Sequence, residues 1–312
     1  MNQRESGLRD EISRLKKEKN ALIMAHYYQR DEIQEIADFI GDSLALAQQA
    51  AKTDADIIVM CGVHFMGETA KILCPDKKVL VPDLDAGCSL ADSCDPEEFE
   101  KFVKGHPGYT VISYVNTTAA VKANTDIVVT SGNARKIVDS LPAGEKIIFG
   151  PDRNLGGYIN AVTGREMLLW NGACHVHDRF SIEKISEMKR LHPGAKILVH
   201  PECRRPLQLM ADKVGSTAAL LKFAHEDDAK EYIVVTESGI LFEMRRACPD
   251  KTFLAAPADD SECQCNNCEY MKLNTLEKVA AALRDEQPEI IVDPEIASRA
   301  IKPITRMLEL SK

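Results

Sequence analysis

The chain has 312 residues with 45% hydrophobic and 28% charged side chains, which is enough for two or three globular domains. Its net charge of −9 argues against a nucleic-acid partner, because phosphate backbones bind basic surfaces. No apolar run approaches the roughly 18 residues of a membrane-spanning helix, and the N-terminal residues are too polar for a signal peptide. We therefore expect a cytoplasmic protein that binds neither nucleic acid nor membrane.

Short apolar segments rich in β-branched residues alternate with helical patterns along the chain. Several of these segments are apolar throughout, which is typical of strands buried on both faces of a parallel sheet. The alternation predicts an α/β fold. The predicted strands are 21–25, 56–60, 78–82, 110–115, 126–130, 146–150, 196–200 and 232–236.

A repeat of about 86 residues links three of these strands, which end at His26, Tyr114 and His200. An HPG turn precedes two of them, at 106–108 and at 192–194. An aspartate follows each strand end 12 positions later, and a hydroxyl residue follows about five positions after that; these are Asp38, Asp126 and Asp212, then Ser43, Ser131 and the pair Ser216/Thr217. The spacing predicts three α/β units of one topology.

Units of one topology usually pack with equivalent ends around a shared centre, and ligands of parallel sheets bind at the carboxyl ends of the strands. We place the units at 1–87, 88–173 and 174–268, followed by a helical extension at 269–312. In this extension, residues 275–308 predict two helices around a turn at Pro288 and Pro294, which we expect to pack back on the first unit.

Ten cysteines are many for a chain of this size in a reducing compartment, where they indicate metal ligands or catalytic groups before disulfides. Cys88 and Cys174 lie 86 residues apart, and a third step of this length ends near the segment ECQCNNC, which opens with Cys263. We therefore expect three thiols to converge on the central axis, one from each unit. Buried packing suits Cys61, Cys74 and Cys248 better.

Three converging thiolates suit a 4Fe–4S cluster with one open iron, which could act as a Lewis acid on a substrate. The alternative is a zinc ion held by three cysteines and a histidine such as His175 or His177.

Polar residues occupy the last position and the second position after each of the three strand ends. They are His26, Tyr28, Tyr114, Asn116, His200 and Glu202, and most are of types that carry protons in acid–base catalysis. Ser43, Ser131 and Ser216 open predicted helices, whose N-termini hold anions well. Taken singly, each serine could be an ordinary helix N-cap. Three at matching offsets indicate substrates with several carboxylate or phosphate groups.

The motifs AHYYQ, GDSLALA, SYVNTTA, FGPDRNLG, NGACHVH, VHPEC, VGSTAAL and CxxCxYMKLNTL resemble those of the quinolinate synthase (NadA) family, from about residue 16 onward. The resemblance implies three pseudo-symmetric αβα sandwich domains with parallel sheets around a central pseudo-threefold axis. It also implies condensation of iminoaspartate with dihydroxyacetone phosphate to quinolinate, with release of phosphate and water, as a step of NAD biosynthesis. The supplier of iminoaspartate would be L-aspartate oxidase or aspartate dehydrogenase.

The resemblance further implies an oxygen-sensitive 4Fe–4S cluster held by Cys88, Cys174 and Cys268. Glu202 and Tyr28 would form the acid–base couple. The other catalytic positions would be His26, Tyr114, His200 and Thr217. The substrate-binding positions would be His26, Ser43, Tyr114, Asn116, Ser131, His177, His200, Glu202, Ser216 and Thr217.

The cysteines around Cys268 depart from the simplest family pattern. Cys265 and Cys268 could form a pair that releases the cluster when oxidised. Cys94 could replace Cys88 as a ligand, but it breaks the 86-residue offset.

Overall fold

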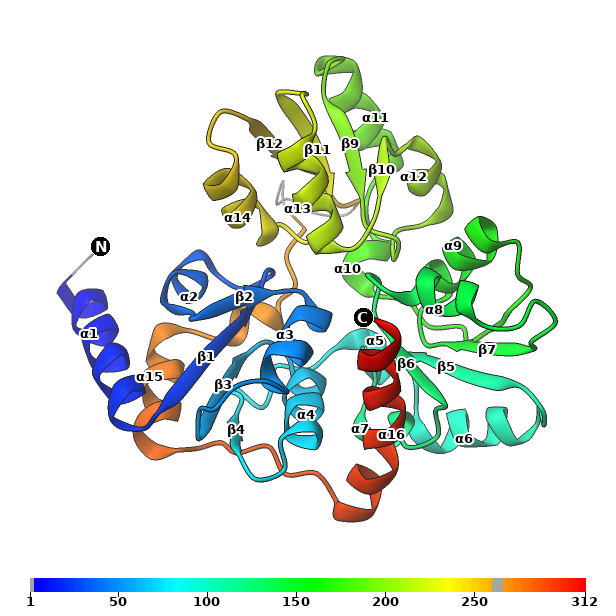
Figure 1. Cartoon of the computed structure of the whole chain (residues 1–312). Helices are drawn as coiled ribbons and strands as arrows, with labels where there is room; N and C mark the ends of the chain where they lie inside the picture. Colours follow the sequence, from blue (N-terminus) through cyan, green and yellow to red (C-terminus); the bar gives the residue numbers. More distant parts are fainter. Residues whose placement is uncertain (1–2, 260–265) are drawn as a thin grey trace.

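The computed structural model describes residues 3–259 and 266–312, which form three parallel four-stranded sheets with helices around them (Figure 1). The strand orders are β2-β1-β3-β4, β6-β5-β7-β8 and β10-β9-β11-β12, so each sheet repeats one topology. The predicted α/β class and its three pseudo-symmetric αβα units are confirmed.

The elements of the first unit run from α1 to β4. They are α1 (Gln3–Glu18), β1 (Ala21–His26), α2 (Asp31–Ile36), β2 (Phe39–Gly41), α3 (Ser43–Ala50), β3 (Ile57–Cys61), α4 (His64–Leu73) and β4 (Lys78–Leu80). The second unit contains α5 (Ser89–Asp92), α6 (Pro96–Lys104), β5 (Thr110–Tyr114), α7 (Ala119–Lys122), β6 (Ile127–Val129), α8 (Ala134–Ser140), β7 (Ile147–Gly150), α9 (Arg153–Thr163) and β8 (Leu168–Leu169).

The third unit and the C-terminal extension complete the described chain. The third unit contains α10 (His175–Asp178), α11 (Ile182–Leu191), β9 (Lys196–Val199), α12 (Arg205–Met210), β10 (Lys213–Val214), α13 (Thr217–Glu226), β11 (Glu231–Val235), α14 (Ile240–Ala247) and β12 (Thr252–Ala255). The extension contains the 3-10 helix η1 (Met271–Leu273), α15 (Leu276–Asp285) and α16 (Pro294–Leu310). No helix in the described ranges is long and apolar enough to cross a membrane.

The three repeated aspartates explain the register of the repeat. Each lies just before an edge strand, and its carboxylate accepts a hydrogen bond from a backbone N–H near the start of the neighbouring central strand. The pairs are Asp38 with Ile23 at 2.9 Å, Asp126 with Val111 at 2.8 Å and Asp212 with Ile197 at 2.8 Å. In each pair the aspartate N–H also donates to the carbonyl of that same residue, so the edge strand is fixed against the central one.

All eight predicted strands are present, with ends shifted by one or two residues. The sequence analysis did not predict the edge strands β2, β10 and β12. These have two to four residues and include lysine, threonine or glycine, so they lack the continuous apolar pattern of the central strands.

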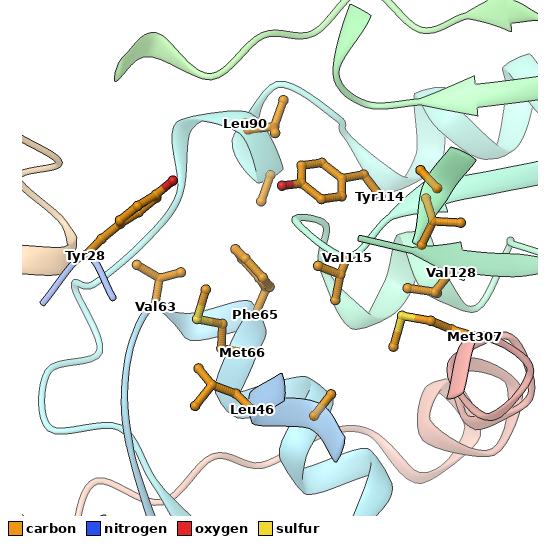
Figure 2. Close-up of a cluster of buried hydrophobic side chains, with 14 of the residues drawn as sticks. Tyr28, Leu46, Val63, Phe65, Met66, Leu90, Tyr114, Val115, Val128 and Met307 are labelled. Atoms are coloured by element: carbon orange, nitrogen blue, oxygen red, sulfur yellow. The ribbon is translucent and has the colours of Figure 1, made fainter. Parts of the chain in front are cut away.

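The largest apolar cluster is continuous between the first two units (Figure 2). Phe65 and Met66 of α4 face Tyr114 and Val115 at the end of β5, and Met307 of α16 packs beside the second sheet. This core places the carboxyl ends of β1 and β5 on either side of one central space.

The two C-terminal helices pack on different units. As expected, α15 packs on α1 and β3 of the first unit. The same expectation was wrong for α16, which packs mainly against β6 and α7 of the second unit and also contacts α4 of the first (Figure 1). The helix buries Ala300, Ile304 and Met307 completely, so its apolar face covers the junction between the two units.

Candidate active site

A cavity of about 690 Å³ lies where the carboxyl ends of the three sheets meet. It is lined by all of the predicted catalytic, binding and ligand residues except Ser216. These are His26, Tyr28, Ser43, Cys88, Tyr114, Asn116, Ser131, Cys174, His177, His200, Glu202, Thr217 and Cys268. The fold therefore brings together positions that lie up to 242 residues apart (from 26 to 268).

His26 and His200 occupy equivalent places in the first and third units. The Nδ1 atom of His26 accepts the N–H of Tyr28 at 3.1 Å, and that of His200 accepts the N–H of Glu202 at 3.4 Å. Burial lowers the pKa of each histidine to about 3, so both rings are neutral near pH 7. With Nδ1 accepting, the proton of each neutral ring resides on Nε2. The Nε2 atom of His200 lies 3.2 Å from the Ser131 hydroxyl.

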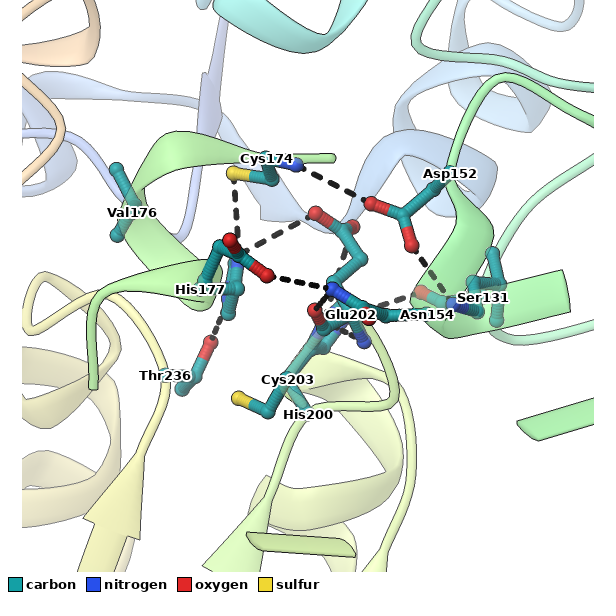
Figure 3. Close-up of polar contacts among 12 residues, drawn as sticks. Ser131, Asp152, Asn154, Cys174, Val176, His177, His200, Glu202, Cys203 and Thr236 are labelled. Carbon is teal, nitrogen blue, oxygen red and sulfur yellow. Dashed lines mark hydrogen bonds and ion pairs between the residues drawn. The ribbon is translucent and has the colours of Figure 1, made fainter. Parts of the chain in front are cut away.

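Glu202 is buried at the centre of the polar contacts (Figure 3). Tyr114 donates its hydroxyl proton to one carboxylate oxygen at 2.5 Å, and Nδ1 of His177 lies 3.2 Å from the other. Burial alone would raise the pKa of Glu202, but His177, His200 and the Tyr114 hydrogen bond outweigh it and lower the pKa to about 2. Glu202 is therefore an ionised carboxylate in a water-poor site, and such a group can accept a proton.

A chain of hydroxyl groups connects Tyr28 to His177. The Tyr28 hydroxyl lies 2.8 Å from the Thr217 hydroxyl and 2.7 Å from that of Thr236, which in turn lies 2.9 Å from Nε2 of His177. Burial raises the pKa of Tyr28 and of Tyr114 well above the usual value, so both phenols keep their protons near pH 7. Figure 2 shows the two phenol groups pointing toward one another across the central space.

Gly239 brings the third unit against the segment that carries Tyr28. A Cβ atom at Gly239 would lie 2.8 Å from the Tyr28 backbone and 2.9 Å from the carbonyl of Gln29. The side-chain amide of Gln34 donates to the Gly239 carbonyl at 2.9 Å and also to the carbonyl of Gln29. Only glycine permits this contact, which fixes Tyr28 relative to the third unit.

Cys88, Cys174 and Cys268 each follow the fourth strand of a unit, and all three thiols line the cavity. Burial raises the pKa of Cys88 and Cys268 to about 12 and that of Cys174 well above its usual value, and the neighbouring thiols add to the effect in Cys88 and Cys174. The metal-free site therefore holds protonated thiols. A positively charged metal centre would replace their protons and remove the repulsion among the thiolates.

The other cysteines of the sequence analysis fall into two groups. Cys94 is buried beside Phe99 and Val111 in the second unit and does not line the cavity, so it is a packing residue and not a substitute for Cys88. Cys263 and Cys265 lie outside the described residues. The buried cysteines expected to serve as packing groups are Cys61, Cys74 and Cys248, and each lies in an apolar cluster.

The three predicted helix-opening serines differ in their positions. Ser216 caps α13, where its hydroxyl accepts the N–H of Ala219 at 3.3 Å. Ser43 is the first residue of α3, whose cap is Asp42. Ser131 precedes α8 by three residues. Ser43 and Ser131 line the cavity with free access to a ligand, whereas Ser216 is occupied by its own helix and is not in the lining.

Sequence reasoning missed several buried polar groups at the site, namely Asp42, Asp152, Thr236, Glu237 and Lys272. Asp152 and Glu237 each lie two residues beyond the second strand of a unit. The repeat was aligned only on the first strands, so a signal at the second strands was present but not compared. Glu237 is fully buried and forms an ion pair with Lys272 at 2.9 Å.

Comparison with known proteins agrees with this geometry. The family model described as quinolinate synthetase A protein matches residues 10–309. The chain belongs to the quinolinate synthase family. Quinolinate synthase of Microcystis aeruginosa is 55% identical over 300 residues, covering 96% of this chain and 94% of that protein. The Chloroherpeton thalassium enzyme is 53% identical over 303 residues, covering 97% and 94%, and the Trichodesmium erythraeum enzyme is 55% identical over 300 residues, covering 96% and 93%.

The two buried histidines predict how stability depends on pH. In the unfolded chain each histidine binds a proton below its ordinary pKa of 6.5, whereas in the folded protein it stays neutral down to about 3. The unfolded state therefore binds more protons in this window. The free energy of unfolding of the metal-free protein should fall by about 1.4 kcal/mol per pH unit for each histidine as the pH drops below about 6.5.

Chemical unfolding measured between about pH 7 and pH 5 checks this expectation. His26→Gln should flatten the dependence, and His225→Gln, at an exposed position on α13, should not. Identical slopes for His26→Gln and the unsubstituted protein would contradict the assignment.

Proposed function

We propose that the chain catalyses the condensation of iminoaspartate with dihydroxyacetone phosphate to quinolinate, with release of phosphate and water. The observation that carries this proposal is the meeting of three thiols, one after each sheet, with an ionised glutamate and two phenols in one buried cavity. The membership of the quinolinate synthase family supports it. Iminoaspartate is unstable, so we also propose L-aspartate oxidase or aspartate dehydrogenase as its supplier in the cytoplasm.

The three thiols fit a 4Fe–4S cluster with three cysteine ligands. Cys88, Cys174 and Cys268 line the same cavity, and no further cysteine of the described ranges lines it. When bound, such a cluster would supply a Lewis acid at its open iron for a substrate oxygen or nitrogen. The polar groups nearest to Cys174 then decide what protons can move.

Glu202 is the proposed base of the enolisation and dehydration steps. Its carboxylate is ionised, and its two oxygens are already oriented by Tyr114 and His177. A proton that Glu202 accepts could be passed to a leaving hydroxyl through Tyr114. This arrangement allows a single carboxylate to serve as base and, once protonated, as acid.

Tyr28 is the proposed proton donor on the opposite wall of the cavity. Its proton can be replaced through Thr236 from His177. Thr217 and His200 would hold the reacting groups in place. His26 and His200 present neutral Nε2–H groups, which orient oxygen atoms of a substrate without adding a charge.

Asn116 and two serines are the proposed anchors for the anionic substrate groups. The side-chain oxygen of Asn116 is buried with no hydrogen-bond partner among the residues that the structure describes. This amide lines the cavity, so a bound substrate would complete its hydrogen bonds. The substrates together carry one phosphate and two carboxylates.

The positions of the serines predict different effects on kinetics and on stability. Ser43→Ala and Ser131→Ala should each raise a KM by about tenfold, the equivalent of a lost hydrogen bond to a charged group of about 1.5 kcal/mol. Ser216→Ala should mainly lower the free energy of unfolding, by about 1 kcal/mol, because it removes a helix cap. Steady-state kinetics with each substrate varied, together with urea unfolding, check both effects. Unchanged KM values for both substrates in Ser43→Ala and Ser131→Ala would remove these hydroxyls from the binding site.

A zinc-stabilised protein without this activity is the alternative that a specific observation favours. The Cys174 sulfur, a His177 ring nitrogen and a Glu202 oxygen all lie within 4.8 Å of one another, as metal ligands do. An iron–sulfur electron carrier is the second alternative.

Anaerobic purification followed by an assay separates the three functions. We expect a brown protein with iron and sulfide and with absorption near roughly 400 nm, which is typical of thiolate-bound iron–sulfur clusters. Incubation with iminoaspartate and dihydroxyacetone phosphate should then yield quinolinate. A colourless zinc protein would support the scaffold, and a brown protein without quinolinate production would support the electron carrier.

A further inference from the structure

Two buried carboxylates contact the backbone at two of the three cavity cysteines. Asp152 and Glu237 are completely buried, and each lies two residues beyond the second strand of its unit, β7 or β11. A carboxylate of Asp152 accepts the N–H of Cys174 at 3.2 Å (Figure 3), and one of Glu237 accepts the N–H of Cys268 at 3.1 Å. The contacts are equivalent although Cys174 follows Asp152 by 22 residues and Cys268 follows Glu237 by 31.

Each carboxylate divides its two oxygens in the same way. In Asp152, Oδ1 accepts the N–H of Leu155 at 2.7 Å and so caps α9, while Oδ2 serves Cys174. In Glu237, Oε2 accepts the N–H of Gly239 at 2.7 Å, while Oε1 serves Cys268. One oxygen therefore fixes the turn of its own unit and the other fixes the cysteine. An amide side chain has a single acceptor oxygen and could not do both.

The first unit lacks this device. The residue two positions beyond β3 is Val63, which has no acceptor and lines the cavity wall. The segment before Cys88 is instead held by its backbone, since the carbonyl of Ala86 accepts the N–H of His64 at 2.7 Å.

Glu237 has a further link that Asp152 does not share. The Nζ atom of Lys272 forms its ion pair with the same Oε1 that serves Cys268, and it also donates to the Tyr28 carbonyl at 2.6 Å. Moving Glu237 would therefore disturb Cys268 and the Tyr28 segment together.

We propose that Asp152 and Glu237 are positioning residues that hold Cys174 and Cys268 in the geometry for binding a metal centre, while Cys88 is positioned without a carboxylate. The proposal rests on the cluster assigned under the proposed function. Partners one step beyond metal ligands orient those ligands, and their loss commonly lowers metal affinity by roughly 10- to 100-fold.

Asp152→Asn and Glu237→Gln are the direct tests, because each keeps the side-chain volume and removes one acceptor. Asp293→Asn is the matched control. Asp293 accepts two backbone N–H groups at the start of α16 with the same oxygen, Oδ1, so an amide can replace it. It lies at an exposed position and contacts no cysteine.

The first measurement uses the metal-free protein and needs no cluster. Alkylation by iodoacetamide, followed by mass spectrometry of each cysteine peptide, should show a several-fold faster reaction at Cys174 alone in Asp152→Asn. In Glu237→Gln the increase should occur at Cys268 alone. Cys88 should react at the unchanged rate in both, and Asp293→Asn should match the unsubstituted protein. Equal acceleration at all three thiols would indicate general loosening and overturn the proposal.

The second measurement uses the loaded protein. Iron release to a chelator should be about 10- to 100-fold faster in both variants than in Asp293→Asn, and the EPR signal of the reduced cluster should change. Unchanged alkylation and unchanged iron release would overturn the inference. If the unsubstituted protein binds no iron and sulfide, the proposed function fails instead, and the alkylation pattern still decides whether the two carboxylates position their cysteines.

Discussion

Glu202→Gln is expected to lower kcat by about 10²- to 10⁴-fold, the range typical of a lost general acid–base group. Glutamine has nearly the same volume and can still accept the hydrogen bond of Tyr114, but it cannot accept a proton near pH 7. The carboxylate is ionised over the whole working range because its pKa is about 2. The loss should therefore appear at every pH between about 6 and 9. Anaerobic steady-state kinetics on protein of measured iron content checks this expectation.

Glu243→Gln is the control for this substitution. Glu243 is a buried glutamate on α14 that pairs with Arg246 at 2.8 Å and does not line the cavity. It should keep the unsubstituted kcat. A Glu202→Gln variant with full kcat and a bound cluster would exclude Glu202 as the base.

The second large effect is expected for the cysteines. Alanine at Cys174 should abolish the bound iron and sulfide and the absorption near roughly 400 nm, since a cube held by three thiolates cannot lose one without losing a corner. Alanine at Cys88 or Cys268 should have the same effect. Iron and sulfide analysis per chain after anaerobic reconstitution measures it directly.

Cys94→Ala is the matched control, because Cys94 is only six residues from Cys88 and is also buried. It should keep its iron, although the small cavity left beside Phe99 should cost some stability. The reverse pattern, with iron lost in Cys94→Ala and kept in Cys88→Ala, would move the ligand to Cys94 and contradict the 86-residue repeat.

Much of the fold was predictable because the repeat depends on local chemistry. The aspartates at 38, 126 and 212 tie an edge strand to a central strand by the same hydrogen bond, so a fixed sequence offset corresponds to a fixed geometry. The residues at the ends of β1, β5 and β9 meet because carboxyl ends of equivalent sheets face one centre. The sequence could therefore predict a common site before any contact was known.

Other features depended on contacts that no offset contains. The side of the protein on which α16 packs is set by which surface is left apolar after the units assemble, and helix periodicity does not give that. Ser43 and Ser216 have the same sequence environment, yet Asp42 caps α3 while Ser216 caps its own helix. Lys272 reaches Glu237 and Tyr28 only because η1 returns to the cavity.

The end of α16 has a consequence for any attempt to rebuild the fold from identical copies. The Asn133 side chain donates to the Ser311 hydroxyl at 2.8 Å, and its oxygen accepts the N–H of Thr130, a residue of the cavity lining. The loop that presents Ser131 is thus supported by a helix that belongs to none of the three units. A designed ring of three identical units would reproduce the sheets and the strand ends, but it would leave this loop without its support, so the asymmetric helix is part of the minimum that such a design must retain.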